Sequence, residues 1–574
     1  MNRRTSGSGS WNWRSRVVLV LFVLVAAALL SRAVYLQMFD NGFLQAQGKE
    51  RHLRVVKIPA HRGMLLDRNG EPLAVSTPVD SIWMDPQEIV AADNRVPELA
   101  RALGLPASAV MDLLRKNLDK QFVYLVRGMD PYVAQRVLDL DIPGVYSQRS
   151  YRRYYPAGEV TAQVLGFTNV DDVGQSGLEL AYNQWLRGVP GAERVIVNRY
   201  GSPVQAVESL ATPRPGKDLV TSLDLRVQYL AYRALKQTVL AQGAESGSVI
   251  VMNPRTGEVL AMANQPSFNP NNRSDYAPNT SRNRAVTDQF EPGSAMKPFT
   301  ILAALLSGQY TPASIVNTSP GYYRVDGYKI SDDGLDYGAI NLTTILEKSS
   351  NVGASKIALT LAPHLMWDTL NAFGFGQPSG SGFPGEASGA LPPYQSWSQA
   401  RQATISYGYG VAVTALQLAN AYDILADNGV RISPTFVRQD TPPAGERVIP
   451  ARYATTLRRM LQTVVSNEGT GKLAEVPGYY ISGKTGTSHI AQNGGYASHD
   501  YYSVFCGIAP ATDPQLVVVV VIREPSRGQY FAATVAAPLF AQVMAGALRL
   551  LDIPPDNLSS LTTVADVVTP GHSS

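Results

Sequence analysis

The chain has one cysteine and six histidines among its 574 residues. A lone thiol cannot close an internal disulfide, and Cys506 ends the apolar run Ser503–Cys506, which is typical of a buried strand. The histidines show neither paired spacing nor an HExxH motif, so the sequence predicts no metal site. A formal net charge of only +4 does not favour nucleic acid as a partner.

Charged residues are also sparse, at 17% against 45% hydrophobic residues, which is typical of a folded chain. The length exceeds one ordinary core, so at least two domains are expected. Long apolar runs are scarce. Val17–Leu30 is wholly apolar, and Ala33–Met38 extends it past Arg32 to about 20 residues, which is enough to cross a bilayer.

Four arginines precede this span and no comparable cluster follows it; they are Arg3, Arg4, Arg14 and Arg16. The positive-inside rule therefore predicts a single-pass protein with a cytoplasmic N-terminus and everything after about residue 38 outside. A cleaved signal peptide is the alternative, because Ser31–Ala33 has the small-x-small form of a cleavage site. No clean Ala-x-Ala follows the run, which favours an uncleaved anchor.

The segment 39–220 contains turn signals, short strand-like runs and two helical patterns at 96–103 and 107–118, but no recognisable catalytic constellation. Three patterns in it combine charges with turn-forming residues; they are His61–Arg68, Arg152–Pro156 and Gly174–Glu179. We interpret them as ion pairs that fix an irregular domain.

The segment 221–556 has a different pattern. A helix is predicted at 223–240, a hairpin at 248–262, strands at 502–508 and 516–523, and a last helix at 534–551. This order predicts an α+β domain with one antiparallel sheet faced by helices. The expected division is a cytoplasmic tail (1–16), a transmembrane helix (17–38), an N-terminal domain (39–220), a C-terminal domain (221–556) and a flexible tail (557–574).

The stretch Glu291–Thr300 offers a hydroxyl nucleophile, Ser294, with an amine three residues later, Lys297. On a helix, positions i and i+3 share one face. Pro292 and Gly293 form the turn that begins this helix, where free N–H groups favour developing negative charge. A neutral Lys297 could take the serine proton, provided that desolvation or a nearby cation lowers its pKa.

Two further motifs follow in order. Lys348–Asn351 contains Ser349-x-Asn351 after a helical pattern, and Gly483–Thr487 contains Lys484-Thr485-Gly486 after an apolar run. Each is common by itself. The order S-x-x-K, S-x-N, K-T-G is a strong signal, because these motifs are together typical of serine β-lactamases and penicillin-binding proteins.

With these motifs, the span and the closing segment Ala547–Asp556, the chain resembles the class B penicillin-binding proteins of the division-specific, penicillin-binding-protein-three-like type, nearly end to end. The resemblance implies a D,D-transpeptidase without cofactor that cross-links peptidoglycan stem peptides in the periplasm of a Gram-negative bacterium, anchored in the inner membrane. It also implies that 39–220 is a non-catalytic pedestal that contacts division partners, notably a polytopic glycan polymerase.

The resemblance also implies roles for single residues. Ser294 attacks the D-alanyl-D-alanine carbonyl and Lys297 accepts its proton. Ser349 relays the proton, Lys484 keeps the network positively biased, and Asn351 holds the geometry and the peptide amide. Thr485 and Thr487, on either side of Gly486, bind the terminal carboxylate, and N–H groups of Ser294 and Thr487 stabilise the oxyanion. Penicillins leave a stable ester on Ser294.

Aromatic residues are predicted around the bound ligand; they are Tyr409 (with Tyr407 beside it), Tyr501, Tyr530 and Phe531. Two departures from the division pattern stand out. Ala532-Ala533 replaces an expected pair of glycines, and Ser488–Ile490 replaces a more basic run. Both suggest a specialised second copy. If a cation at His489 helps to hold an anionic ligand, acylation should improve as the medium acidifies, because a free histidine titrates near pH 6.5.

Two other classes of protein stay open. One is a hydrolase of the same fold, either a carboxypeptidase or a β-lactamase, which rapid turnover of penicillin would reveal. The other is a β-lactam sensor or a division scaffold without enzymatic activity. A sensor would need a cytoplasmic output domain, and only about 16 residues precede the span. A scaffold would not require all three motifs.

Overall fold

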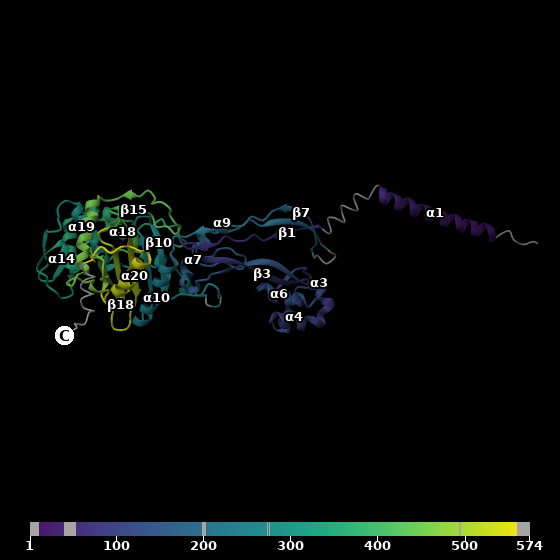
Figure 1. Cartoon of the computed structure of the whole chain (residues 1–574), viewed down its shortest axis with the longest axis horizontal. Helices are drawn as coiled ribbons and strands as arrows, with labels where there is room; N and C mark the ends of the chain where they lie inside the picture. The colour runs from purple at the N-terminus through teal and green to yellow at the C-terminus, as the bar shows by residue number, and fades with distance from the viewer. Residues whose placement is uncertain are drawn as a thin grey trace, which may run out of the picture. The chain divides into compact units, whose positions relative to one another are not determined.

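The computed structural model describes residues 11–38, 53–197, 203–272, 274, 276–492 and 495–558 (Figure 1). The predictions for the first ten residues and for the tail after residue 558 lie outside this part of the chain. The chain forms two compact units. Unit 1 comprises Met1–His61, Pro78–Tyr151 and Gly188–Pro215, and unit 2 comprises Arg62–Thr77, Arg152–Arg187 and Gly216–Ser574.

Unit 1 begins with the predicted apolar helix, α1 (Trp11–Met38). Its stretch Trp13–Tyr35 is long and apolar enough to cross a membrane, and it is the one such helix among the described residues. The helix therefore provides single-pass membrane anchoring.

The rest of unit 1 has an antiparallel three-stranded sheet and a small helical core. The sheet has the order β1 (Leu53–Ile58), β6 (Gly191–Val197), β7 (Pro203–Ala211). The core surrounds Ile82, Leu99 and Val137, which are fully buried. Its elements are α3 (Pro86–Ile89), η1 (Val90–Arg95), α4 (Val96–Leu103), α5 (Ala107–Lys116), β4 (Val123–Met129) and α6 (Pro131–Leu138); β3 (Pro72–Met84) and β5 (Val145–Tyr154) have residues in both units.

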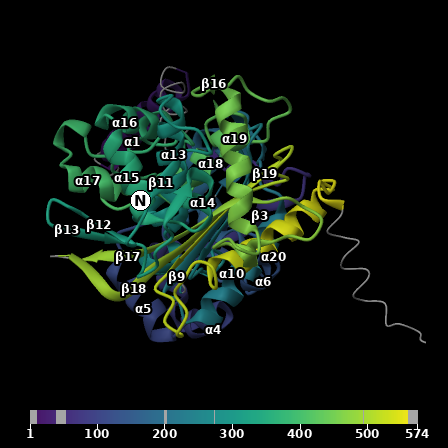
Figure 2. The same cartoon turned by 90° about the vertical axis from the view of Figure 1, so that its left-hand side faces the viewer.

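Unit 2 is built on the predicted antiparallel sheet, whose strand order is β10-β9-β19-β18-β17 (Figure 2). Its strands are β9 (Ser246–Asn253), β10 (Glu258–Gln265), β17 (Ser482–Gln492), β18 (Gly495–Ala509) and β19 (Leu516–Arg523). The hairpin and both later strands occur where the sequence predicts them. Cys506 is fully buried in β18, as expected.

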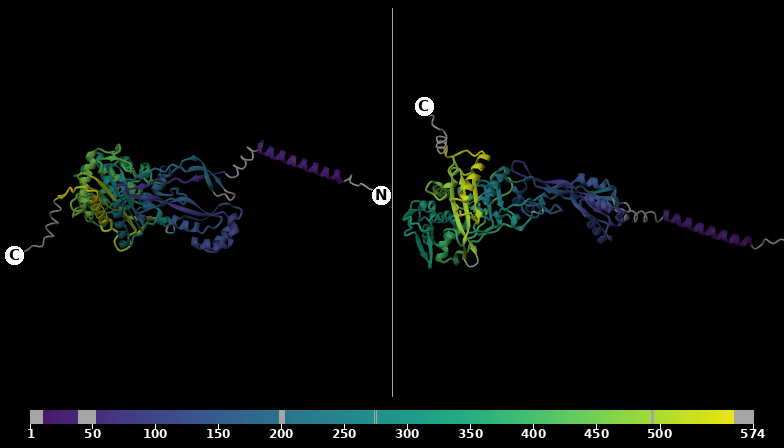
Figure 3. Two further views of the ribbon diagram at one scale, coloured as in Figure 1. Left: turned by 45° about the vertical axis from the view of Figure 1, so that its right-hand side comes forward. Right: turned by 90° about the horizontal axis from the view of Figure 1, so that it is seen from below.

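Strand β19 shows why helices cover both faces of this sheet. Val517, Val519 and Val521 face a core with helices such as α13 (Lys297–Leu306) and α18 (Ala415–Ala426). The alternate residues Val518 and Val520 face a second core with α10 (Leu225–Gln242) and α20 (Ala536–Leu550). Successive side chains of a strand point to opposite faces of the sheet. A strand that is apolar throughout must therefore be packed against helices on both faces. Figure 3 shows yellow α20 beside the sheet.

The remaining elements of unit 2 are short or lie between the strands. They are β2 (Leu65–Leu66), η2 (Gly158–Val160), α7 (Ala162–Leu165), α8 (Gly177–Ala181), α9 (Asn183–Leu186), β8 (Leu219–Val220), α11 (Pro278–Ser281), α12 (Arg284–Thr287), η4 (Gly293–Met296), β11 (Ile315–Asn317), β12 (Tyr322–Val325), β13 (Tyr328–Ser331), β14 (Ala339–Asn341), α14 (Leu342–Glu347), α15 (Asn351–Thr360), α16 (Pro363–Ala372), η5 (Tyr394–Ser396), α17 (Gln399–Ile405), β15 (Val430–Arg431), β16 (Glu446–Arg447), α19 (Ala451–Gln462), η6 (Thr463–Val465) and η7 (Lys472–Ala474).

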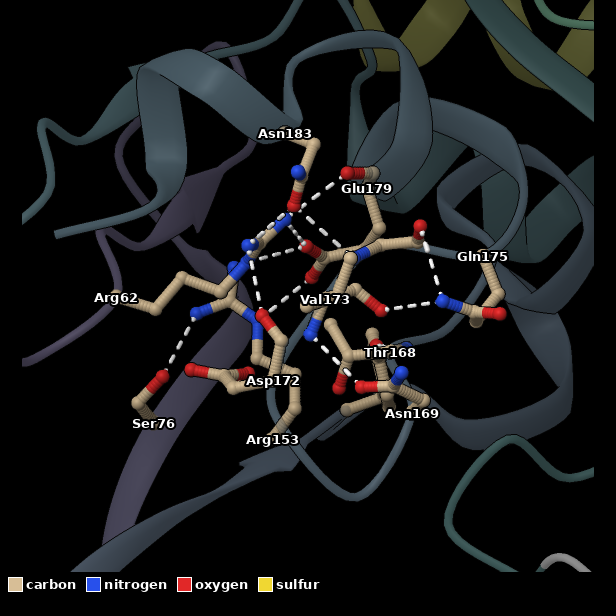
Figure 4. A network of polar contacts seen from close by, with 12 residues as sticks. Arg62, Ser76, Arg153, Thr168, Asn169, Asp172, Val173, Gln175, Glu179 and Asn183 are labelled. Atoms are coloured by element: carbon tan, nitrogen blue, oxygen red, sulfur yellow. Dashed lines mark hydrogen bonds and ion pairs between the residues drawn. The ribbon is translucent and has the colours of Figure 1, made fainter.

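The three charged patterns of the N-terminal segment meet in one buried ion-pair network, formed by Arg62, Arg153 and Glu179 (Figure 4). Arg62 contacts Oε2 of Glu179 through Nη2 at 2.7 Å, and Arg153 contacts Oε1 through Nε at 2.6 Å. Arg62 also donates to Oδ1 of Asn183, and Arg153 donates to Ser76. The prediction that these patterns form ion pairs is confirmed, and all of these residues belong to unit 2.

Candidate active site

The nucleophile candidate Ser294 lies in the short helix η4, which runs directly into α13. The preceding Gly293 has φ 55°, a left-handed conformation that glycine adopts without strain. Strand β17 runs close to this turn. A Cβ added at Gly486 would lie 2.6 Å from the carbonyl oxygen of Pro292, so the absence of a side chain there permits the close approach. Ser294 thus stands between a helix start and the strand of the K-T-G motif.

Lys297, at the start of α13, is fully buried. Its Nζ donates to Oδ1 of Asn351 at 2.7 Å, to Oγ of Ser349 at 3.1 Å and to the carbonyl oxygen of Ser349. Burial lowers the pKa of Lys297 to about 7, although the carboxylates of Asp332 and Asp333 act to raise it. The sequence hypothesis required a lowered pKa, and desolvation supplies it.

Lys484 approaches the same serine from β17. Its Nζ donates to Oγ of Ser349 at 2.9 Å and to the carbonyl oxygen of Thr485 at 3.1 Å. Burial, with the nearby Lys297, lowers the pKa of Lys484 well below its ordinary value. Two buried amines around one hydroxyl disfavour two positive charges, so at least one of them is held neutral. We call Lys297, Ser349 and Lys484 the amine cluster.

Ser349 has φ 58°, which is uncommon for a residue other than glycine. The following helix α15 begins at Asn351 and is capped by Ser350, whose side chain accepts from the N–H of Gly353. This arrangement places Ser349 and Asn351 on either side of the cap, where both reach Lys297. The described residues show no hydrogen bond between Ser294 and Lys297, which is common for catalytic pairs without substrate.

A cleft of about 720 Å³ opens over these residues. It brings together most of the predicted site residues; Ser294, Ser349, Asn351, Tyr409, Thr485, Thr487, Tyr501, Tyr530 and Phe531 line it. Lys297 and Lys484 are buried behind the lining and reach it through Ser349. Among the described residues, no group of three or more histidine, cysteine, aspartate or glutamate side chains is placed to hold a metal ion.

The threonines of the K-T-G motif are oriented by their neighbours. The Oγ1 of Thr487 accepts from the backbone N–H of Ala532 at 3.0 Å, so its own hydroxyl proton is free to point to an acceptor in the cleft. The Oγ1 of Thr485 shares a hydrogen bond with Thr470 at 3.0 Å. Neutral hydroxyl donors of this kind suit a carboxylate ligand.

One side of the cleft is an aromatic wall, formed by His489, Tyr501, Tyr530 and Phe531. Adjacent ring centroids lie 4.5, 4.1 and 4.3 Å apart along this order, and Tyr501 and Tyr530 are stacked. The Nδ1 of His489 lies 2.9 Å from the carbonyl oxygen of Ala497. The wall presents flat apolar surface next to the polar motif residues.

The comparison with known families matches two consecutive parts of the chain. Residues 247–545 match the model described as the penicillin-binding protein transpeptidase domain. Residues 57–221 match the model of the penicillin-binding protein dimerisation domain. The chain belongs to the penicillin-binding proteins. Its two-domain fold, mixed α/β with antiparallel sheets, is that of this family.

Curated relatives match this penicillin-binding protein over nearly its whole length. A protein of Pseudomonas aeruginosa named probable peptidoglycan D,D-transpeptidase PbpC is 46% identical, over 95% of this chain and 96% of the relative. The peptidoglycan D,D-transpeptidase FtsI of Escherichia coli is 40% identical, over 94% of this chain and 92% of the relative.

Solved structures agree with this assignment. The transpeptidase domain of penicillin-binding protein 3 from Burkholderia pseudomallei is 40% identical, with a TM-score of 0.54, and covers 58% of this chain and 97% of that chain. Penicillin-binding protein 3 from Mycobacterium tuberculosis, solved with aztreonam, is 28% identical, with a TM-score of 0.67, and covers 88% of this chain and 98% of that chain.

Several residues of this penicillin-binding protein's site have no sequence motif. Glu291, next to the nucleophile turn, accepts through Oε1 from the N–H of Gly410 and from the Tyr496 hydroxyl, and Tyr496 stands edge-on to Tyr409. Burial raises the pKa of Glu291. Asp332, in the turn after β13, contacts the S-x-N motif. Only the fold brings Asp332 to the cleft and places Glu291 and Tyr496 behind Tyr409, which lines it. Glu291 alone lies inside a stretch that the sequence marked.

Proposed function

We propose that this chain, a peptidoglycan D,D-transpeptidase, cross-links stem peptides through an acyl-enzyme on Ser294 during septal cell-wall synthesis. The amine cluster beside Ser294 carries the proposal, because it provides a neutral base in the folded chain. The family and the names of the relatives support the reaction class, and the three motifs support the residues.

In the first half-reaction, the Ser294 Oγ attacks the carbonyl between the two terminal D-alanines of a donor peptide. Lys297, neutral at its lowered pKa of about 7, takes the hydroxyl proton. A bond forms between Oγ and the carbonyl carbon, and the backbone N–H groups of Ser294 and Thr487 stabilise the oxyanion. Thr485 and Thr487 hold the terminal carboxylate.

Collapse of this intermediate breaks the bond to the terminal D-alanine nitrogen. Ser349, which contacts both amines, passes a proton to that nitrogen, and free D-alanine leaves. Asn351 keeps Lys297 in position. An amine of a second stem peptide then attacks the ester carbonyl, its proton goes back to Ser294, and a new amide replaces the ester. The aromatic residues Tyr409, Tyr501, Tyr530 and Phe531 hold the peptides over the site.

Penicillin resembles the D-alanyl-D-alanine end and is expected to leave a stable ester on Ser294. The test is mass spectrometry of the full chain after exposure to benzylpenicillin. One penicilloyl adduct on the Ser294 peptide is expected, and none on Ser294→Ala. Labelling that persists in the variant would remove Ser294 from the mechanism. Rapid loss of the adduct with release of hydrolysed penicillin would indicate a β-lactamase instead.

The orientation follows from the same proposal, because donor peptides lie outside the cytoplasm. Residues 1–16 form the cytoplasmic tail, 17–38 the transmembrane helix, 39–220 the pedestal and 221–556 the periplasmic transpeptidase domain. A reporter that is active only in the cytoplasm, fused after Ser574, should be silent, and an active fusion would reverse the orientation.

The pedestal is proposed to contact division proteins, including a polytopic glycan polymerase. Copurification of the full chain with such a polymerase from bacterial membranes tests this, compared with a chain that lacks residues 85–144, which belong wholly to unit 1. Equal recovery of the polymerase with both chains would contradict a role for the pedestal.

A further inference from the structure

Asp332 is a buried carboxylate that no motif of the reaction includes. It follows the hairpin of β12 and β13 directly, and only 5% of the residue's surface is exposed. Its backbone is fixed, because its N–H donates to Gly321 and its carbonyl accepts from Leu335. A buried carboxylate needs hydrogen-bond donors around it. The donors to Asp332 therefore show which segment of the chain its carboxylate holds in place.

All three of its side-chain donors come from consecutive residues at the start of α15. Oδ2 accepts from the Ser350 hydroxyl at 2.6 Å, and Oδ1 accepts from the backbone N–H groups of Asn351 at 2.6 Å and Val352 at 2.9 Å. These are free N–H groups of a helix start, which a carboxylate stabilises by hydrogen bonding and by the helix dipole. In addition, Asn351 donates through Nδ2 to the carbonyl oxygen of Ser331, the residue before Asp332.

We propose that Asp332 is a positioning residue for acyl transfer, which holds Ser349 and Asn351 against the Lys297 amine through the first turn of α15. The contacts run without a gap from Asp332 to Asn351, and from the Asn351 side chain to Lys297. The inference rests on the proposed role of Lys297 as the base.

The charge of Asp332 acts on the same amine. Burial is the largest influence on Lys297 and lowers its pKa, and Asp332 is the first of two carboxylates that oppose this. The other groups that face the amine are Lys484, which repels a proton, and the exposed Asp333. Removing the negative charge of Asp332 therefore lowers the pKa of Lys297 further, so that the base loses its proton at a lower pH.

The experiment measures the second-order rate of acylation by a fluorescent penicillin across pH 5 to 9, with the detergent-solubilised full chain. Asp332→Asn should acylate about ten- to a hundredfold more slowly at its plateau, because Asn351 is held less firmly. The acid side of its pH profile should also move to lower pH, by about one unit. A merely structural role would lower the rate without moving the profile.

Two further variants separate position from charge. Asp332→Glu keeps the charge but misplaces the carboxylate, so the rate should fall while the acid side of the profile stays in place. Asp333→Asn removes a neighbouring exposed carboxylate, which solvent screens, so its profile should move less than that of Asp332→Asn. Melting temperatures of all variants identify misfolding; if Asp332→Asn does not fold, the rate of Asp332→Glu remains as the test, because a folded Asp332→Glu that acylates like the wild type would overturn the proposal.

The proposal is overturned if Asp332→Asn acylates like the wild type, if its profile does not move, or if Asp332→Glu moves the profile as far as Asp332→Asn. A failure of the proposed function is distinct, because then the wild type itself would form no ester on Ser294 or would show no acid limb to its profile.

Discussion

In the ion-pair network of unit 2, Glu179 lies 2.7 Å from Arg62 and 2.6 Å from Arg153, whereas in the amine cluster no described carboxylate forms a salt bridge with Lys297 or Lys484. Both groups are buried. In the network, both guanidinium groups share one carboxylate, and their planar forks match its geometry. In the amine cluster, the described hydrogen-bond partners of the two lysines are hydroxyl, amide and carbonyl oxygens, which carry no negative charge.

This difference shows how the same burial serves two tasks. Where buried charges are paired, removing one partner is costly, so the arrangement fixes backbone segments from three parts of the sequence. Where buried amines are unpaired, the charged form is the costly one, and the amine becomes a base near neutral pH. Lysine suits the second task because it can lose its proton, which arginine cannot.

The largest expected effect comes from replacing a lysine of the amine cluster with arginine, the cation of the ion-pair network. Lys297→Arg cannot act as a base, so the second-order rate of acylation of Ser294 by penicillin should fall about 10³- to 10⁴-fold. The adduct is measured by mass spectrometry over time, with the melting temperature as the control for folding. Acylation within tenfold of the wild type would remove Lys297 from the mechanism.

The second prediction breaks the network. Glu179→Gln removes the carboxylate that forms salt bridges with both buried guanidinium groups and should cost about 3–5 kcal/mol of the free energy of unfolding. Chemical denaturation of the full chain in detergent measures this. Glu208→Gln is the matched control, because it breaks the exposed Arg194–Glu208 pair and should cost about 1 kcal/mol or less. Similar losses in both variants would show that the network adds no special stability.

The third prediction follows from the lowered pKa of Lys297. The neutral amine becomes scarcer below about pH 7, so acylation by penicillin should slow about fifteenfold between pH 7 and pH 5.5. If protonation of His489 helps to hold the ligand, the acylation rate should instead rise as the pH falls. The measured dependence of the rate on pH therefore decides between the two predictions. A rate that rises toward acid in the wild type, with a flatter profile in His489→Arg, would favour the histidine.

The smallest expected effect removes one neutral contact of the network. Ser76 accepts from Nη1 of Arg153 at 3.2 Å, and Ser76→Ala should cost about 1 kcal/mol in the same denaturation experiment. The carboxylate of Glu179 still neutralises the arginine. A loss as large as that of Glu179→Gln would mean that the hydroxyl, rather than the charge, holds Arg153.

The sequence alone was sufficient to predict those features that a local pattern of residues marks. Helix α4 and strand β19 have the predicted bounds, because an apolar period and clear turn residues mark them. The three motifs could be found since their chemistry depends on fixed spacing within one turn or strand. The ion-pair network could be anticipated as a kind of contact, although not as a single cluster.

Asp332 had no such signal. Aspartate is a common residue in turns, so its position after a short hairpin gives no signal. Only the fold shows that the carboxylate of Asp332 accepts hydrogen bonds from the start of α15. The division of the chain is similar: residues 62–77 and 152–187 cluster with unit 2, and long-range packing decides this, not local composition. The contacts of Tyr496 with Glu291 and Tyr409 also depend on long-range packing.

The close approach of the nucleophile turn and β17 has a consequence for the evolution of drug resistance. Any side chain at Gly486 would meet the Pro292 carbonyl, and one at Gly293 would lie 2.9 Å from the carbonyl oxygen of Thr487 in a strained backbone. Single substitutions that loosen penicillin binding at these glycines therefore disable the enzyme as well. The half-exposed Phe531 at the edge of the cleft has no such constraint, so a changed side chain there can hinder a drug and still admit a peptide.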